Sequence, residues 1–325
     1  MDVAHLRIVG KNVGSEMVTV LTSVWNTPPR MLSRSISSIL AQTHREFEFL
    51  MLDDGSDSVA TRDCLREFAA RDPRIRLSFE PRRGLTATLN RGLEMARGDL
   101  IARQDADDWS NPRRLEAQSA HLAAHPDIGL VGSAAWTHQD DETALWVIRM
   151  PGSQAEILDA FWTRNPFVHG SVLFRAFAAR ALNGYRVELG AAQDYDFFWR
   201  LTEIVGASNL DEPLYHYRYS AESVSASRAS EQARATRAAR LLAGMRRRGE
   251  PEDAAAVLRV ASGGDWFRAS LKQADHVMLA GRYGRAAREY FRLARSRPAS
   301  LTAWGKLARL ALFSVAPPVR RFCFR

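Results

Sequence analysis

Short apolar runs and amphipathic segments alternate along the first third of the chain. Runs rich in β-branched, aromatic or aliphatic residues predict buried strands at 17–24, 47–52, 75–79 and 100–104. The helical spacing of apolar residues predicts helices between these strands at 31–42, 61–70 and 86–96. Strands that alternate with helices favour a parallel α/β sheet, in which ligands bind beyond the carboxyl ends of the strands.

The middle of the chain continues this pattern less regularly. Further strands are predicted at 128–134, 144–150, 167–174 and 214–219, and His169 falls in the third of them. Further helices are predicted at 112–124, 157–162 and 194–205, the first of them opened by Asn111 as N-cap and by Pro112. One α/β domain is therefore expected to extend to about residue 225.

The composition changes near residue 221, beyond which Ala, Arg and Leu dominate. Helices are predicted there at 232–247, 252–261, 265–280, 283–295 and 301–313. Residues 226–325 hold 21 Lys and Arg against 7 Asp and Glu, whereas residues 1–225 hold 24 against 30. Three parts are therefore expected: an N-terminal extension at 1–16, an α/β domain at 17–225 and a basic α-helical region at 226–325.

The sequence argues against several classes of protein. It has no run of roughly 18 apolar residues that could form a transmembrane helix. The first residues lack the apolar segment and the small-residue cleavage site of a signal peptide. The two cysteines, Cys64 and Cys323, are far apart and indicate neither a disulfide framework nor a zinc site. We therefore expect a cytoplasmic protein.

A cluster of carboxylates, Asp105-Ala106-Asp107-Asp108, follows the predicted strand at 100–104. Magnesium-like ions use one or two carboxylates together with substrate phosphates, so an Asp-x-Asp pair at a strand end can hold a metal–diphosphate. Taken alone, the pair is also explained as an acidic turn that caps the next helix. Only the surrounding motifs can decide between the two interpretations.

Seven groups of residues, in this order, closely resemble the motifs of family 2 glycosyltransferases with the GT-A fold. They are Thr22–Asn26, Ser35–Thr43, Phe47–Phe49 with Asp53–Asp57, Asn90–Gly92 to Gly98–Ala102 with Asp105–Asp108, His169–Ser171, Asn183–Arg186 and Gln193–Leu201. The resemblance covers roughly residues 15–225 and implies a Rossmann-like, mostly parallel central sheet flanked by helices. It does not reach the last hundred residues, which are expected to form a C-terminal α-helical extension.

The resemblance implies an inverting transferase that depends on Mn²⁺ or Mg²⁺. Such an enzyme moves a sugar from a UDP- or dTDP-type nucleotide-diphosphate sugar to a glycan or lipid-linked acceptor in bacterial surface-polysaccharide biosynthesis. The alternative is a catalytically inactive glycan-binding or scaffold protein of the same fold. Nucleotidyl transferases and Rossmann dehydrogenases fit poorly, because Asn26-Thr27-Pro28-Pro29 stands where they need a Gly-rich loop.

The resemblance also assigns the donor-side residues. Asp107 would coordinate the metal, and Asp105 would complete the metal site by approaching the ribose or a metal-bound water. Asp54 would accept a hydrogen bond from the imide N–H of uracil or thymine, although Asp-Gly-Ser also favours turns. The base pocket would be lined by Ser23, Val24 and Trp25, of which Trp25 is alternatively a core residue. Arg83 could reach the diphosphate, or it could simply be solvated.

On the acceptor side, Asp194 is the expected general base. It stands in Gln193-Asp194, where the family usually has Glu-Asp. Asp194 could instead cap the helix that it begins, with Asp196 equally important. His169 could contact the donor sugar or the acceptor, or it could be a structural residue.

The basic region at 226–325 suits phosphates or an anionic membrane, and no nucleic-acid partner is expected. Its helices would place the protein peripherally at the inner face of the cell membrane, where lipid-linked acceptors occur. A protein partner, self-association or merely solvated arginine-rich helix faces would account for the same composition.

Overall fold

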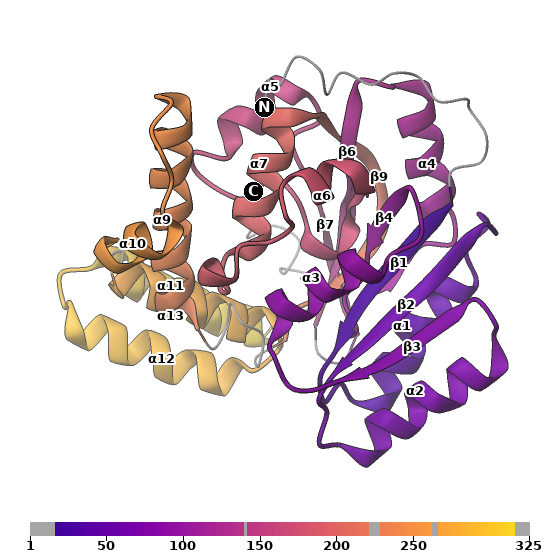
Figure 1. Cartoon of the computed structure of the whole chain (residues 1–325). Coiled ribbons are helices and arrows are strands. Elements are labelled where there is room, and N and C mark those ends of the chain that lie inside the picture. Colours follow the sequence, from indigo (N-terminus) through magenta and orange to yellow (C-terminus); the bar gives the residue numbers. More distant parts are fainter. Residues whose placement is uncertain (1–16, 140–141, 221–227, 262–265, 316–325) are drawn as a thin grey trace. The chain divides into compact units, whose positions relative to one another are not determined.

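The structure is a computed structural model that describes residues 17–139, 142–220, 228–261 and 266–315 (Figure 1). The expected N-terminal extension at 1–16 lies outside the described residues. The chain forms two compact units. The first contains the described part of Met1–Ala135 with Ile148–Tyr217, and the second contains Trp136–Val147 with the described part of Arg218–Arg325.

Four parallel strands form one half of the sheet. They are β1 (Val18–Val24), β2 (Phe47–Asp54), β3 (Ile75–Glu80) and β4 (Leu100–Arg103), in the spatial order β3-β2-β1-β4. Between them in the chain lie α1 (Pro29–Leu40), α2 (Val59–Arg71) and α3 (Leu85–Met95). Every residue of β2 is buried, as expected for a strand of a sheet with both faces covered. The predicted elements of this half are confirmed, with each end within two residues of the prediction.

The other half of the sheet is antiparallel. β8 (Leu173–Arg175) pairs with β4 and with β6 (Ile128–His138), and β9 (Gly206–Arg218) pairs with β5 (Trp109–Ser110). The full order is β3-β2-β1-β4-β8-β6-β9-β5, so the sheet is mixed. The remaining helices of this unit are α4 (Arg114–Ala124), α5 (Gln154–Ala160), α6 (Ala176–Ala181) and α7 (Gln193–Ile204).

The predicted strand at 167–174 is wrong for most of its length. His169–Ser171 form a short 3-10 helix, η2, and only β8 follows as a strand. Gly170 lies so close to Tyr215 that an added Cβ would come within 1.9 Å of the hydroxyl oxygen, so no residue with a side chain fits there without a shift. The predicted strand at 214–219 is the end of the longer β9, whose polar first part does not form an apolar run.

The second unit is mainly helical. Its helices are α9 (Ala229–Arg247), α10 (Ala254–Val260), α11 (Trp266–Leu279), α12 (Tyr283–Ser296) and α13 (Leu301–Val315), and β7 (Ala144–Ile148) pairs with β6. The core between α11 and α12 includes Val277, Tyr290 and Leu293, and Trp146 and Tyr219 pack against it. The predicted C-terminal helices are confirmed. No helix in the described ranges has both the length and the apolar character needed to cross a membrane.

Candidate functional site

The carboxyl ends of β1, β2 and β4 meet at one edge of the parallel half-sheet, because β1 pairs in parallel with both of the others. Trp25 follows β1, Asp54 ends β2, and Asp105 lies just beyond β4. This is the edge at which ligands of parallel sheets bind.

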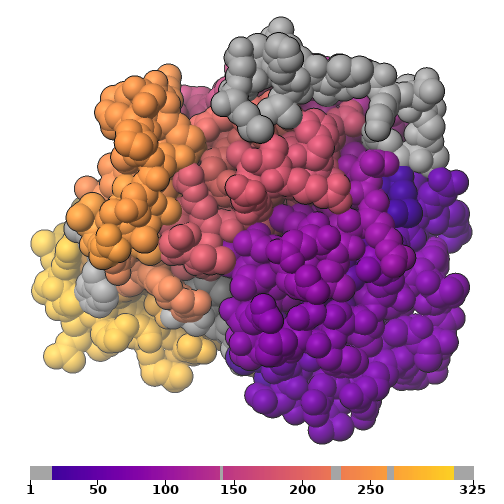
Figure 2. All heavy atoms as spheres, in the orientation of Figure 1, coloured from indigo at the N-terminus to yellow at the C-terminus, as the bar shows by residue number. Residues whose placement is uncertain are grey.

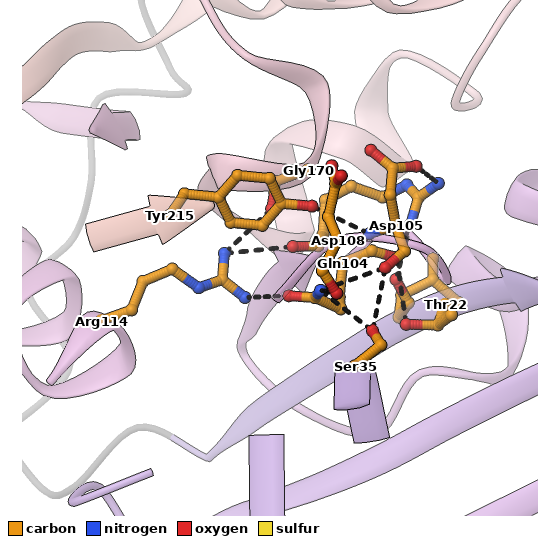
Figure 3. Close-up of polar contacts among 10 residues, drawn as sticks. Thr22, Ser35, Gln104, Asp105, Asp108, Arg114, Gly170 and Tyr215 are labelled. Atoms are coloured by element: carbon orange, nitrogen blue, oxygen red, sulfur yellow. Dashed lines mark hydrogen bonds and ion pairs between the residues drawn. The ribbon is translucent and has the colours of Figure 1, made fainter. Parts of the chain in front are cut away.

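An ion pair inside the turn after β4 fixes Asp105. Arg103 Nη2 lies 2.6 Å from Asp105 Oδ1, and the Arg103 side chain is only 1% exposed. Arg103 also donates a hydrogen bond to the carbonyl oxygen of Gln104. The amide of Asp105 donates to the hydroxyl oxygen of Tyr215 at 3.2 Å, and Ser35 Oγ donates to its carbonyl oxygen at 3.0 Å (Figure 3). Asp105 is thus held through both its side chain and its backbone.

A second buried arginine supports the same turn. Arg114, on α4, is fully buried and donates to the carbonyl oxygens of Arg103 and Gly170, both at 3.1 Å (Figure 3). Burial lowers the pKa of the Arg114 guanidinium to about 10. Burial raises the pKa of Tyr215 well above its ordinary value, so its hydroxyl is neutral near pH 7. The turn after β4 is therefore held by hydrogen bonds from side chains that are buried away from solvent.

The other acidic residues of the turn differ in burial. Asp107 is partly buried, whereas Asp108 is buried and its carbonyl oxygen accepts a hydrogen bond from Gln104 at 3.0 Å. Among the described residues, no three His, Cys, Asp or Glu side chains form a complete metal site. Two carboxylates in one turn still suit a cation that takes its remaining oxygen ligands from a diphosphate. The donor set fits a metal shared with substrate.

Asp54 is bound to the loop that follows β3. Its carboxylate is 1% exposed, forms an ion pair with Arg82 and accepts hydrogen bonds from the amides of Arg83 at 2.7 Å and Gly84 at 3.0 Å. The Gly84 amide is shared with the other oxygen at 3.2 Å, so three donors occupy most of the roughly four acceptor positions of the carboxylate. Arg82 also lies 3.9 Å above the Trp25 ring, which is 50% exposed. The Trp25 ring therefore lies at the surface, and Trp25 is not a core residue.

The other expected donor-side residues have different surroundings. Ser23 is partly buried, and the Val24 side chain belongs to the hydrophobic core, so only its backbone can face a ligand. The side chain of Arg83 is exposed, and its backbone amide makes the contact with Asp54. The guanidinium that lies beside Asp54 and Trp25 belongs to Arg82.

Asp194 lies in the first turn of α7, where it is partly exposed. Its Oδ2 accepts a hydrogen bond from Asn165 Nδ2 at 2.8 Å. The N-cap of α7 is Ala192, which provides no side-chain cap, so Asp194 does not occupy the capping position. Because one hydrogen bond to this carboxylate is described, lone pairs of Asp194 remain that can take up a proton or accept a further hydrogen bond.

Asp196, two residues later, has a structural environment. Its carboxylate is completely buried and forms ion pairs with Arg200 at 2.8 Å and Arg186 at 3.2 Å. Arg200 in turn donates to the carbonyl oxygens of Leu182 at 3.2 Å and Gly184 at 2.9 Å. Asp196 therefore ties α7 to the segment that contains Gly184 and Arg186.

Two polar atoms close to these carboxylates are buried without a hydrogen-bond partner in the described part of the chain: His169 Nε2 and the hydroxyl oxygen of Tyr185. Their rings meet edge to face with centroids 6.1 Å apart. Burial, assisted by the charge of Arg103, lowers the pKa of His169 to about 3, so the ring is neutral near pH 7. Burial raises the pKa of Tyr185, and the charges of Asp194 and Asp105 raise it further. The charges of Asp105 and Asp194 therefore both favour the neutral form of the Tyr185 hydroxyl.

Three residues that shape this site have no role assigned from the sequence: Arg103, Arg114 and Tyr185. A signal existed for Arg103, because a charged residue in a predicted buried strand needs a partner. Nothing in the sequence marks Arg114 as buried, since it lies in an ordinary amphipathic helix.

Comparison with known sequences places the chain among glycosyltransferases. The family described as Glycosyl transferase family 2 matches residues 19–182. EpsE of Bacillus subtilis (strain 168), a glycosyltransferase by name, is 35% identical over 209 residues and the match covers 62% of this chain and 72% of EpsE. The amylovoran biosynthesis glycosyltransferase AmsE of Erwinia amylovora is 29% identical over 210 residues, with 64% and 78% covered.

Solved structures share the fold at low sequence identity. The mannosyltransferase PcManGT from Pyrobaculum calidifontis, in complex with GDP-Man and Mn²⁺, has a TM-score of 0.54 and 18% identity, covering 95% of this chain and 83% of that one. TarS of S. aureus in complex with UDP-GlcNAc has a TM-score of 0.57 and 15% identity, covering 90% and 79%. At these identities the likeness shows the fold alone, and the expected GT-A-like fold with a C-terminal helical region is confirmed.

Proposed function

The chain belongs to glycosyl transferase family 2 and is a transferase enzyme, and we propose that it transfers a sugar with inversion from a UDP- or dTDP-type donor. The acceptor is a glycan or a lipid-linked sugar in polysaccharide biosynthesis, the process named for AmsE. The observation that carries the proposal is the placement of Asp54 and Asp105 at the carboxyl ends of two parallel strands, with the half-exposed Trp25 ring after the strand between them. Carboxylates and an aromatic ring at this edge suit a nucleotide diphosphate, because parallel sheets bind their ligands there.

Asp194 is the proposed general base. The acceptor hydroxyl oxygen attacks the anomeric carbon, the bond from that carbon to the diphosphate oxygen breaks, and the hydroxyl proton passes to the Asp194 carboxylate. The hydrogen bond from Asn165 to Oδ2 orients this carboxylate and leaves Oδ1 for the proton. His169 is a poor alternative, because a group with a pKa of about 3 holds a proton weakly near pH 7.

Asp107 is the proposed metal ligand on the donor side, with Asp105 directed to the ribose or to a water of the metal. When bound, Mn²⁺ or Mg²⁺ neutralises the charge that develops on the leaving diphosphate. The rigid turn beneath Asp105 keeps both carboxylates at the end of β4 while the donor binds and leaves.

Trp25 is the proposed stacking surface for the nucleotide base, next to Ser23 and the backbone of Val24. Arg82 lies over the ring and occupies one acceptor position of Asp54, so a base that stacks there displaces Arg82. Its departure frees a lone pair of Asp54 for the imide N–H of uracil or thymine. The Arg82 side chain is 46% exposed and can therefore turn toward solvent, or with Arg83 toward the diphosphate.

His169 is proposed to contact the transferred sugar or the acceptor. Buried polar atoms without partners usually mark the place of a water or a ligand. A sugar hydroxyl both donates and accepts, so it can satisfy His169 Nε2 and the Tyr185 hydroxyl at once.

We expect nucleotide binding that requires a metal. UDP or dTDP should bind in the presence of Mn²⁺ and should not bind in EDTA, because the diphosphate and Asp107 share the cation. Calorimetric titration with UDP, dTDP and GDP measures this, and Trp25→Ala should weaken the preferred nucleotide by the roughly 1–3 kcal/mol of a base–aromatic stack. No binding of any nucleotide under any condition would favour the inactive, glycan-binding alternative.

The solvent face of α12 is the proposed contact with an anionic membrane (yellow in Figure 2). Arg285, Arg288, Arg292 and Arg295 follow one another at helical spacing and are exposed. Arg292 pairs with Glu289, whereas the other three make no ion pair among the described contacts. Phe291 and Trp304 lie in edge-to-face contact and are 48% and 41% exposed. Basic side chains beside exposed aromatic rings are typical of helices that lie in a membrane interface.

Reversing two charges on this face should weaken binding to anionic vesicles. Each arginine close to such a surface contributes about 1 kcal/mol, so loss of both charges in Arg288→Glu with Arg295→Glu should weaken binding at least roughly 30-fold, and the added negative charges weaken it further. Flotation with anionic and neutral vesicles measures this, and Arg66→Glu with Arg91→Glu in the first unit makes the same change of charge elsewhere. Equal binding by both double variants, or binding that salt does not weaken, would contradict the proposal.

A further inference from the structure

The charge of Arg103 is buried beside the carboxylates proposed for the donor. Its side chain is 1% exposed, and Asp105 is its only ion-pair partner in the described chain, at 2.6 Å. Its other contacts are carbonyl oxygens, of Leu21 at 3.3 Å and of Gln104, and its Nε is buried without a hydrogen bond. A buried guanidinium needs a counter-charge, so Arg103 depends on Asp105 for its neutralisation.

Neither partner of this ion pair is free to move away. Arg103 ends a strand in the middle of the sheet, and Arg114 binds its carbonyl oxygen at 3.1 Å. The backbone of Asp105 is held by Tyr215 at its amide and by Ser35 at its carbonyl. These contacts keep the two backbones in place, and the buried guanidinium has no other carboxylate beside it in the described chain, so we expect the pair to persist when a ligand binds.

A divalent cation on Asp105 would lie next to a buried guanidinium that is already paired with this carboxylate. Like charges at such close range disfavour each other, which makes Asp105 a weaker metal ligand than its position in the Asp-x-Asp motif indicates. Asp107 is then the principal carboxylate ligand of the turn, and one carboxylate binds magnesium-like ions weakly unless phosphate oxygens complete the shell.

Resting on the function proposed above, we propose that Arg103 is a positioning residue that withholds Asp105 from the metal. The cation consequently binds tightly only together with the donor diphosphate. Arg103 thereby sets the order of binding and leaves the second Asp105 oxygen for neutral hydroxyl donors, of which the ribose is one.

Measuring free Mn²⁺ by electron paramagnetic resonance, with and without UDP, tests this directly. Wild-type protein should bind Mn²⁺ weakly alone and more tightly with UDP. Arg103→Met should strengthen nucleotide-free Mn²⁺ binding about tenfold or more, the effect that removal of one neighbouring charge has on a carboxylate. Arg103→Lys, which keeps the charge, should behave like wild type, and adding Asp105→Asn to Arg103→Met should cancel the gain.

A second comparison does not require a variant of the buried arginine. With UDP present, Asp107→Asn should weaken Mn²⁺ binding by at least the roughly tenfold that even outer-shell changes cause, whereas Asp105→Asn should change it much less. Equal losses in the two variants, or unchanged nucleotide-free binding in Arg103→Met, would overturn the inference. Failure of wild-type protein to bind any nucleotide with Mn²⁺ would instead reject the proposed function, and the nucleotide-free measurements would still decide the role of Arg103.

Discussion

Asp194→Asn is expected to lower kcat by about 10²–10⁴-fold, the usual contribution of a positioned general base. Asparagine keeps the shape of the side chain and can still meet Asn165, but it cannot take the proton of the acceptor hydroxyl. Binding of UDP or dTDP with Mn²⁺ should be unchanged, because the donor-side residues are at the ends of β1, β2 and β4. Sugar transfer and calorimetric nucleotide binding, measured on the same preparation, separate the two effects.

The control for this variant is Asp159→Asn, which removes the same charge from an exposed position on α5. It should leave both kcat and nucleotide binding unaltered. If Asp194→Asn kept the turnover of wild-type protein, Asp194 would not be the base. A parallel loss of nucleotide binding would show that its role is structural.

The parallel half of the fold could be predicted because its signals are local. Each strand there is an apolar run, and each helix shows apolar residues at helical spacing within a dozen residues. The 3-10 helix at His169–Ser171 could not be predicted in this way. Its tight packing is tertiary, since the hydroxyl of Tyr215, far along the chain on β9, fills the space where a side chain at Gly170 would lie.

In the candidate site, too, the residues with local sequence signals could be predicted, whereas most of their tertiary contacts could not. Strand ends and motif order indicate Asp54, Asp105 and Asp194, because residue type and position in a motif are properties of the sequence. The partners of these carboxylates are mostly tertiary, as for Asn165 with Asp194. Arg103 is the exception, since a charged residue in a predicted buried strand needs a partner, and Asp105 is the nearest carboxylate in the sequence.

The distinction between Asp194 and Asp196 also required the structure. In the sequence both are acidic residues in the first turn of a helix, and either could be the base. Burial and pairing separate them, because Asp196 is enclosed by Arg186 and Arg200 whereas Asp194 meets a neutral amide. The same substitution, Asp to Asn, should therefore affect turnover at position 194 and stability at position 196.

Asp196→Asn is expected to lower the free energy of unfolding by about 3–5 kcal/mol, the typical cost of removing one partner from a buried ion pair. The carboxylate is completely buried and Arg200 is 5% exposed, so the arginine would keep its charge without a counter-ion. For a unit of this size the loss corresponds to a fall of roughly 10 °C in Tm. Thermal unfolding followed by circular dichroism measures it.

Asp194→Asn is the matched control, since it makes the same change two residues earlier on the same helix and should leave Tm unchanged. Arg186, the second partner of Asp196, follows Tyr185 directly in the chain. Loss of the ion pair should therefore also loosen the segment that holds the buried phenol, and transfer should fall in proportion to the unfolded or loosened population. If Asp196→Asn lowered kcat as far as Asp194→Asn is expected to, at an unchanged Tm and with Asp194→Asn fully active, the proton would pass to Asp196, and the assignment of the base to Asp194 would be wrong.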